Sequence, residues 1–215
     1  MGRSRATRRE FLQTSGGLVG AATLLSTNAV VRMAHAAGSD ILRVALIGCG
    51  GRGHGAAQDC LNAAPNTMIV AVADAFEDRA RNVARSLREN PKFKDRVDIP
   101  EDRIFVGLDA YKAATDCGVD IVLLTSPPGF RPWHYRYAIE KGKHVFMEKP
   151  CCTDAPGYRL LMETNKLADE KGLKVVVGLQ RRHDPRYRET IARIHDGAIG
   201  KLLFTRVYWN GSGVW

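Results

Sequence analysis

The chain has 215 residues, of which 45% are hydrophobic and 26% charged, and its formal net charge is +9. These values are ordinary for a globular protein of one or two packed domains, and they exclude disordered and collagen-like chains. Residues 1–36 carry five arginines against Glu10, a net +4, which leaves +5 on the other 179 residues. No basic patch with interleaved aromatic residues stands out, so we expect no nucleic-acid partner.

The cysteines are odd in number, and none are spaced C-x-x-C. No Cys/His group has the spacing of a zinc site, so we expect small buried or half-buried free thiols and no bound metal. The five are Cys49, Cys60, Cys117, Cys151 and Cys152.

Residues 1–36 have the order of parts of an export signal. Thr7–Leu12 is a twin-arginine pattern, Leu18–Val31 is mildly apolar, and Ala34–Ala36 supplies an A-x-A cleavage site. We expect a twin-arginine signal peptide, with the export machinery as a partner and the periplasm or cell envelope as the destination. A membrane anchor or a frayed N-terminal helix stays open as an alternative.

The first motif of the remaining chain is Gly48-Cys49-Gly50-Gly51-Arg52-Gly53. It follows the strand-like run Val44–Ile47 and precedes a helix-compatible segment, His54–Leu61. In a dinucleotide-binding turn the first glycine allows a tight turn and the second lets a pyrophosphate approach the backbone. The third lets the helix pack closely on the sheet, and the start of that helix offers free N–H groups to phosphates.

A second apolar run, Thr67–Ala73, ends at Asp74, 21 residues after Gly53. At this place a carboxylate holds the adenosine ribose hydroxyls and repels a 2′-phosphate, which predicts NAD as the cofactor in preference to NADP. The alternative is a plain glycine turn and a strand-ending aspartate in another α/β fold.

Strands and helices then alternate, which predicts a doubly wound parallel sheet over residues 37–178. Residues 91–103 are expected to form a polar loop. Further predicted strands are Ile104–Val106, Val119–Thr125, His144–Met147 and Lys174–Val177, and predicted helices are Glu77–Asn90, Asp109–Cys117, Trp133–Lys141 and Asp154–Lys171, with Asp109 and Asp154 as caps. Residues 179–215 are expected to begin an incomplete α/β second domain, with a helix to about Asp196 and a strand over Lys201–Tyr208.

Two further strand ends carry reactive residue types, Ser126-Pro127 and Glu148-Lys149-Pro150. A lysine in a dry cleft can exchange a proton with a substrate hydroxyl, so Lys149 is the candidate catalytic residue. The alternative is a surface lysine paired with Glu148.

These motifs, together with Gly142-Lys143-His144-Val145, resemble the Gfo/Idh/MocA family of nicotinamide-dependent oxidoreductases over roughly residues 41–210. The resemblance implies a Rossmann domain followed by an α/β domain, NAD, and a sugar or polyol substrate. It implies catalysis by Lys149, and a substrate site near Arg181 and Arg182. The implied cofactor contacts are Gly48, Cys49, Gly50, Gly51, Arg52, Gly53, Asp74, Ser126, Pro127, His134, Glu148 and Lys149.

The sequence departs from the family pattern in two places. Pro128 stands where an asparagine is usual, and the D-x-x-x-H motif would lie beyond Trp215. The predicted function is hydride transfer between NAD and a sugar, polyol or related hydroxyl compound, with homo-oligomers expected only for a longer form. A cofactor-binding fragment without turnover and an NAD-dependent glycoside hydrolase are the alternatives.

Overall fold

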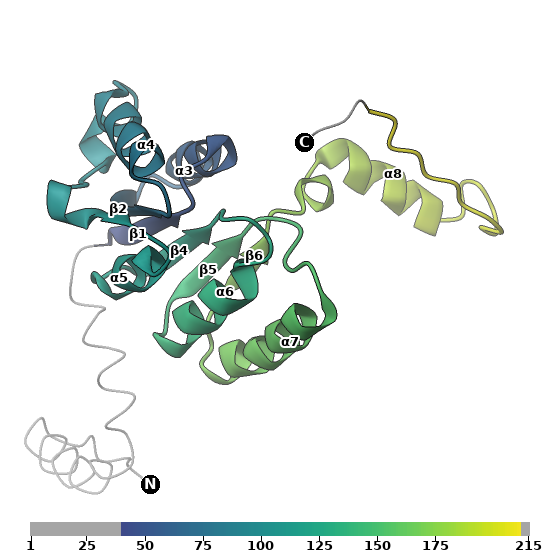
Figure 1. The fold of residues 1–215 in the computed structure, drawn as a ribbon. Coiled ribbons are helices and arrows are strands. Elements are labelled where there is room, and N and C mark those ends of the chain that lie inside the picture. Colours follow the sequence, from purple (N-terminus) through teal and green to yellow (C-terminus); the bar gives the residue numbers. More distant parts are fainter. Residues whose placement is uncertain (1–39, 212–215) are drawn as a thin grey trace, which may run out of the picture. The chain divides into compact units, whose positions relative to one another are not determined.

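The computed structural model describes residues 40–211 and contains one parallel sheet flanked by helices (Figure 1). The export pattern predicted in residues 1–36 therefore lies outside the described residues. The sheet has six strands in the order β3-β2-β1-β4-β5-β6. The strands are β1 Leu42–Ile47, β2 Thr67–Asp74, β3 Ile104–Val106, β4 Ile121–Leu124, β5 His144–Met147 and β6 Val175–Val177.

The strand order reverses between β1 and β4, which pair in parallel from Val44 opposite Ile121 to Ile47 opposite Leu124. Successive connections leave the sheet on opposite sides at this point, so a crevice opens at the carboxyl ends of the two strands. Ligands of open α/β sheets bind in this crevice. The predicted doubly wound parallel sheet is confirmed.

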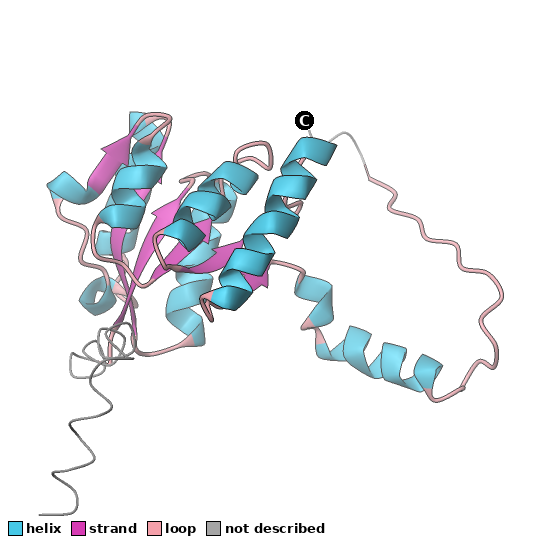
Figure 2. Cartoon of the chain, turned by 90° about the horizontal axis from the view of Figure 1, so that it is seen from below, coloured by secondary structure: helices cyan, strands magenta, loops and turns pink. Residues whose placement is uncertain are grey.

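Two layers of helices cover the sheet (Figure 2). The sheet residues Val44 and Leu46 share one buried cluster with α3 (Gly51–Ala63) and α4 (Glu77–Glu89). Ala45 and Ile47 belong to the opposite cluster, with α5 (Ala110–Asp116), α6 (Arg131–Glu140) and α7 (Ala155–Glu170). Because alternate residues of β1 are buried on both faces, its sequence is a continuous apolar run.

Several predicted boundaries need correction. Helix α3 begins at Gly51, not at His54, so the last glycine of the motif is already helical. Asp154 caps α7 as predicted, since its Oδ1 accepts a hydrogen bond of 2.7 Å from the N–H of Gly157. Asp109 precedes α5, but its side chain makes no cap hydrogen bond and instead pairs with Lys112 at 2.7 Å.

The segment 91–103 is more ordered than a variable polar loop. It contains two short 3-10 helices, Lys94–Arg96 and Glu101–Arg103. Phe93 and Ile99 are each only 3% exposed and belong to the core cluster of α3 and α4. Two buried apolar side chains thus anchor a segment whose polar composition conceals them.

Beyond β6 the chain continues through a 3-10 turn, Gln180–Arg182, into α8, Pro185–His195. The strand predicted over Lys201–Tyr208 is wrong for the described structure: residues 202–211 form no helix or strand. Leu203 and Val207 are each 84% exposed. A strand needs a hydrogen-bonding neighbour, and the described residues supply none here.

The cysteines are all free, with Cys49 buried and the other four partly buried, as the sequence predicts. Among residues 40–211, no helix has the length and apolar character needed to cross a membrane.

Candidate cofactor site

The glycine turn has the geometry that its predicted role requires. Gly48 has a φ of +98°, and a Cβ there would lie 2.4 Å from the backbone nitrogen of Ser126. A Cβ at Gly53 would lie 1.9 Å from the carbonyl oxygen of Gly48, so the start of α3 packs directly on the turn. At Gly50 a Cβ would meet nothing within 4 Å, which leaves open space beside the backbone. This is the cradle that a pyrophosphate group needs.

Asp74, the last residue of β2, lies against this turn. Its Oδ2 accepts a hydrogen bond of 2.6 Å from the backbone N–H of Cys49, and its Oδ1 accepts one of 3.0 Å from the N–H of Phe76. The carboxylate is therefore fixed between the loops that follow β1 and β2. It retains lone pairs that can accept hydrogen bonds from ribose hydroxyls.

Cys49 has a structural role in the turn. Its thiol is buried and lies 3.5 Å from the carbonyl oxygen of Ala73, to which it donates. Burial, reinforced by the charge of Asp74, raises the pKa of this thiol to about 12. Because the thiolate is the reactive form, this cysteine is not a nucleophile at neutral pH.

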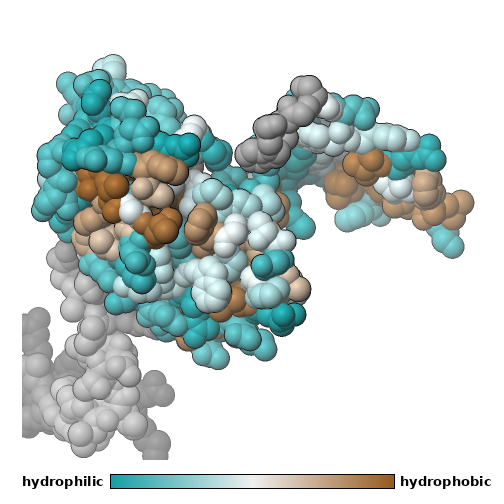
Figure 3. Space-filling view, in the orientation of Figure 1, coloured by the Kyte–Doolittle hydropathy of each residue, from teal (hydrophilic) through white to brown (hydrophobic). Residues whose placement is uncertain are grey.

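A pocket of about 280 Å³ opens at this edge of the sheet, and loops after four strands contribute to it. It joins the polar groups at Gly48 and Asp74 to an apolar wall. On the face seen in Figure 3, apolar side chains gather on the sheet domain among hydrophilic ones. The main lining residues are Gly48, Asp74, Phe76, Arg79, Leu108, Tyr111, Ser126, Pro127, Phe130 and His134.

His134 lies at the base of this pocket in the first half of α6. Its Nδ1 is 3.1 Å from the hydroxyl of Ser126, and its ring stacks on Tyr111 with centroids 4.1 Å apart. Burial lowers the pKa of the imidazole to about 4, so the ring is neutral at physiological pH. Contact of His134 with a cofactor remains a prediction, but the structure brings it to the same pocket as Gly48, Asp74, Ser126 and Pro127.

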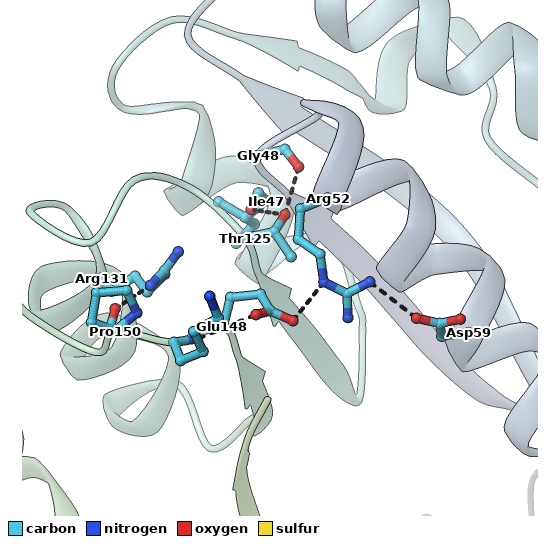
Figure 4. A network of polar contacts seen from close by, with 9 residues as sticks. Ile47, Gly48, Arg52, Asp59, Thr125, Arg131, Glu148 and Pro150 are labelled. Atoms are coloured by element: carbon cyan, nitrogen blue, oxygen red, sulfur yellow. Dashed lines mark hydrogen bonds and ion pairs between the residues drawn. The ribbon is translucent and has the colours of Figure 1, made fainter. Parts of the chain in front are cut away.

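Glu148 and Lys149 follow β5 and differ in environment. Glu148 is buried, and its Oε1 lies 2.7 Å from Nε of Arg52, whose Nη1 lies 3.0 Å from Asp59 (Figure 4). Lys149 is exposed, and within residues 40–211 its ammonium group has no hydrogen bond or ion pair. The alternative of a surface lysine paired with Glu148 is thus right about the exposure of Lys149 and wrong about the pairing, because Arg52 is the cation that Glu148 binds. The described residues also do not enclose Lys149 in a dry cleft.

Other predicted site residues stand apart from the pocket. Arg181 and Arg182 are exposed, and the guanidinium of Arg181 lies 4.8 Å from the ring centre of Tyr187. Their predicted place near a substrate stays a prediction. In the described part of the chain, no three His, Cys, Asp or Glu side chains are grouped so as to hold a metal ion.

Sequence reasoning missed several residues around the site, among them Arg79, Tyr111, Phe130 and Arg131. The first three line the pocket, and Arg131 is buried and donates to the carbonyl oxygen of Pro150. The loops after β2, β3 and β4 lie at the same edge of the sheet as the glycine turn. Their position in the predicted sheet was the one sequence signal that could have located these residues. Which of their side chains face inward depends on packing.

Comparison with known proteins decides the family. A family model described as an oxidoreductase family with an NAD-binding Rossmann fold matches residues 42–179. The chain belongs to this Gfo/Idh/MocA family. The glycine turn, its open space and Asp74 are thus the parts of an NAD-binding domain, and they fit the cofactor.

Three relatives illustrate the likeness. The chain is 30% identical to scyllo-inositol 2-dehydrogenase (NAD(+)) of Bacillus subtilis, over 80% of this chain and 45% of that protein. It is 34% identical to inositol 2-dehydrogenase/D-chiro-inositol 3-dehydrogenase of Halalkalibacterium halodurans, over 77% and 43%. A crystal structure of scyllo-inositol dehydrogenase from Lactobacillus casei with NAD(H) and scyllo-inositol shares the fold, with a TM-score of 0.57, 20% identity, and coverage of 74% and 42%. The chain spans less than half the length of these relatives.

Proposed function

We propose that the chain supplies the cofactor-binding part of an NAD-dependent oxidoreductase that acts on a hydroxyl group of an inositol, a sugar or a related polyol. The observation that carries the proposal is the placement of the glycine turn, Asp74 and the Glu148-Lys149-Pro150 turn after the strands of a family Rossmann sheet, with Arg52 of α3 bound to Glu148. The names of the inositol dehydrogenases that it resembles support the substrate class.

In this proposal the residues that follow each strand have different roles. Backbone N–H groups at the start of α3 bind the pyrophosphate, and Asp74 accepts hydrogen bonds from the ribose. When bound there, NAD would supply the acceptor for a hydride from the substrate carbon. Lys149 would orient the hydroxyl on that carbon and help to pass its proton on to solvent as the carbonyl forms, so that one hydride and one proton leave the alcohol.

We further propose that residues 179–215 open a second domain that helps to hold the substrate. Leu203, Phe204 and Val207 are 75% to 84% exposed. Several neighbouring apolar side chains that are this exposed are typical of a surface on which other parts of a protein pack. Further chain packed on them would also bring groups toward Lys149, which the described residues leave exposed. The export signal of residues 1–36 would take the protein to the periplasm or cell envelope by the twin-arginine route.

The test titrates the 215-residue protein with NADH by fluorescence and assays inositols, sugars and other polyols for NADH formation. We expect saturable NADH binding in both the wild type and Lys149→Met. Where the wild type shows turnover, we expect Lys149→Met to lower the rate by a factor of about 10²–10⁴. Absence of NADH binding would refute the proposal. Release of a chromogenic aglycone without net NADH formation would replace it with an NAD-dependent glycoside hydrolase.

A further inference from the structure

The carboxylate of Glu148 is a meeting point of three segments that are distant in the sequence. Arg52 donates to its Oε1 at 2.7 Å from the start of α3, and the backbone N–H of Lys149 donates to its Oε2 at 3.3 Å. Gly178, just after β6, packs so closely that a Cβ there would lie 2.7 Å from Oε1. One buried side chain therefore touches the glycine turn, the Lys149 turn and the exit of β6.

The two ion pairs of Arg52 differ in environment. The side chain of Glu148 is 7% exposed, whereas that of Asp59 is 69% exposed. An exposed pair contributes little to stability, but a buried carboxylate that loses its cation is strongly unfavourable. Burial opposes the charge of Arg52, yet its hydrogen bonds with Glu148 and Asp59 outweigh burial and raise its pKa. Arg52 is therefore a permanent cation whose important partner is Glu148.

A second arginine holds the other end of the same turn. Arg131, from the first turn of α6, donates to the carbonyl oxygen of Pro150 and is 5% exposed (Figure 4). Lys149 thus lies between two anchored neighbours, Glu148 and Pro150. Its backbone position is set by these contacts, while its own side chain is free of polar contacts within residues 40–211.

We propose that Arg52 is a positioning residue: by holding Glu148 in place it fixes the backbone of the Lys149 turn relative to the glycine turn. The link spans 96 residues of sequence through one hydrogen-bonded ion pair. The importance of this positioning for catalysis rests on the proposed function. The positioning itself is a property of the ligand-free chain and does not depend on it. With the cofactor bound to the glycine turn, the link couples cofactor binding to the placement of Lys149, and such coupling is reciprocal.

The experiment measures amide hydrogen exchange of the segment 148–153 by mass spectrometry, without ligand and with saturating NADH. In ligand-free protein we expect Arg52→Gln to speed this exchange by roughly tenfold, the scale of one lost charged hydrogen bond. Asp59→Asn, which removes only the exposed partner of Arg52, should leave it within about twofold of the wild type. Arg52→Lys keeps the charge and should restore most of the protection. Glu148→Gln, which removes the same ion pair from its other partner, is the fallback if Arg52→Gln does not fold.

With NADH, we expect wild-type protection to rise both in the glycine turn and in the segment 148–153, and the second rise to be lost in Arg52→Gln. Equal ligand-free exchange of 148–153 in Arg52→Gln and wild type would overturn the positioning role, whatever NADH does. Equal NADH-induced protection of 148–153 in the variant and the wild type would overturn the coupling. If the wild type failed to bind NADH, the proposed function would fail, but the ligand-free comparison would still decide the role of Arg52.

Discussion

The buried imidazole of His134 predicts a defined loss of stability in mild acid. The ring is 8% exposed, stacked on Tyr111 and hydrogen-bonded to Ser126, and no charged side chain among residues 40–211 contributes to its pKa shift. Burial lowers its pKa from 6.5 to about 4 in the folded protein. In the unfolded chain the ring recovers the ordinary pKa, so between these two pH values the unfolded state binds more protons.

The sign and size of the effect follow from linkage. The contribution of His134 to the free energy of unfolding is complete above about pH 6.5 and is lost as the pH falls toward about 4. At about pH 5 the unfolded ring is almost fully protonated and the folded ring is almost neutral. The resulting loss of unfolding free energy, relative to about pH 7.5, is ~2 kcal/mol.

The assay is urea unfolding at about pH 7.5 and about pH 5 for the wild type and His134→Asn. Asparagine keeps a polar group near the Ser126 hydroxyl but does not titrate, and its smaller volume lowers stability equally at both pH values. The pH-dependent loss should therefore be smaller in the variant by ~2 kcal/mol. Identical pH dependence in the two proteins would mean that the imidazole is not desolvated in solution, and our reading of the pocket base would be wrong.

Three further outcomes are expected. Gly53→Ala should lower the free energy of unfolding by roughly 1–3 kcal/mol, because its Cβ would overlap the Gly48 carbonyl. Gly50→Ala should unfold like the wild type but bind NADH more weakly. Equal unfolding curves for the two variants would contradict these separate roles. Titrations should give tighter binding of NAD than of NADP, and Asp74→Ser should narrow the gap; NADP binding as tight as NAD to the wild type would contradict the role of this carboxylate. Replacing Arg8 and Arg9 with lysines should leave the protein in the cytoplasm, and normal export of this double variant in cell fractionation would refute the twin-arginine signal.

Much of the fold could be predicted because local signals agreed with the tertiary structure. His144–Met147 and Ile104–Val106 were predicted with their observed bounds, since each is a short apolar run flanked by residues that end strands. The cap at Asp154 was also predictable, because an aspartate before a proline-containing first turn satisfies the helix N-terminus by itself. In these cases the deciding interactions lie within a few residues of sequence.

The errors share the opposite property. The strand expected over Lys201–Tyr208 had suitable alternating residues, but a strand is defined by its neighbour, which sequence periodicity does not reveal. Phe93 and Ile99 are core residues because the fold brings the segment 91–103 back to α4 and β2, with Val97 bridging to Ile69. The alternative that paired Glu148 with Lys149 failed because it relied on adjacency in sequence, while Arg52, 96 residues away, is the cation bound to Glu148.

The Glu148-Lys149-Pro150 motif shows why one short pattern can predict both a fold and a chemical site. Its glutamate is buried and held by Arg52, and its proline carbonyl is held by Arg131. Its lysine and proline are exposed, and the lysine ammonium group is unpaired within the described residues. The carboxylate of Glu148 is thus required by its contact with α3, and a change there would be felt as lost structure, whereas the carbonyl that Arg131 binds belongs to the backbone and is kept in any substitution of Pro150. The lysine side chain contributes none of those contacts, and its role with a substrate stays a prediction. A test within this motif can therefore separate a packing residue from one with a predicted chemical role. Substitutions at Glu148 should alter the free energy of unfolding and amide exchange, whereas Lys149→Met should alter neither.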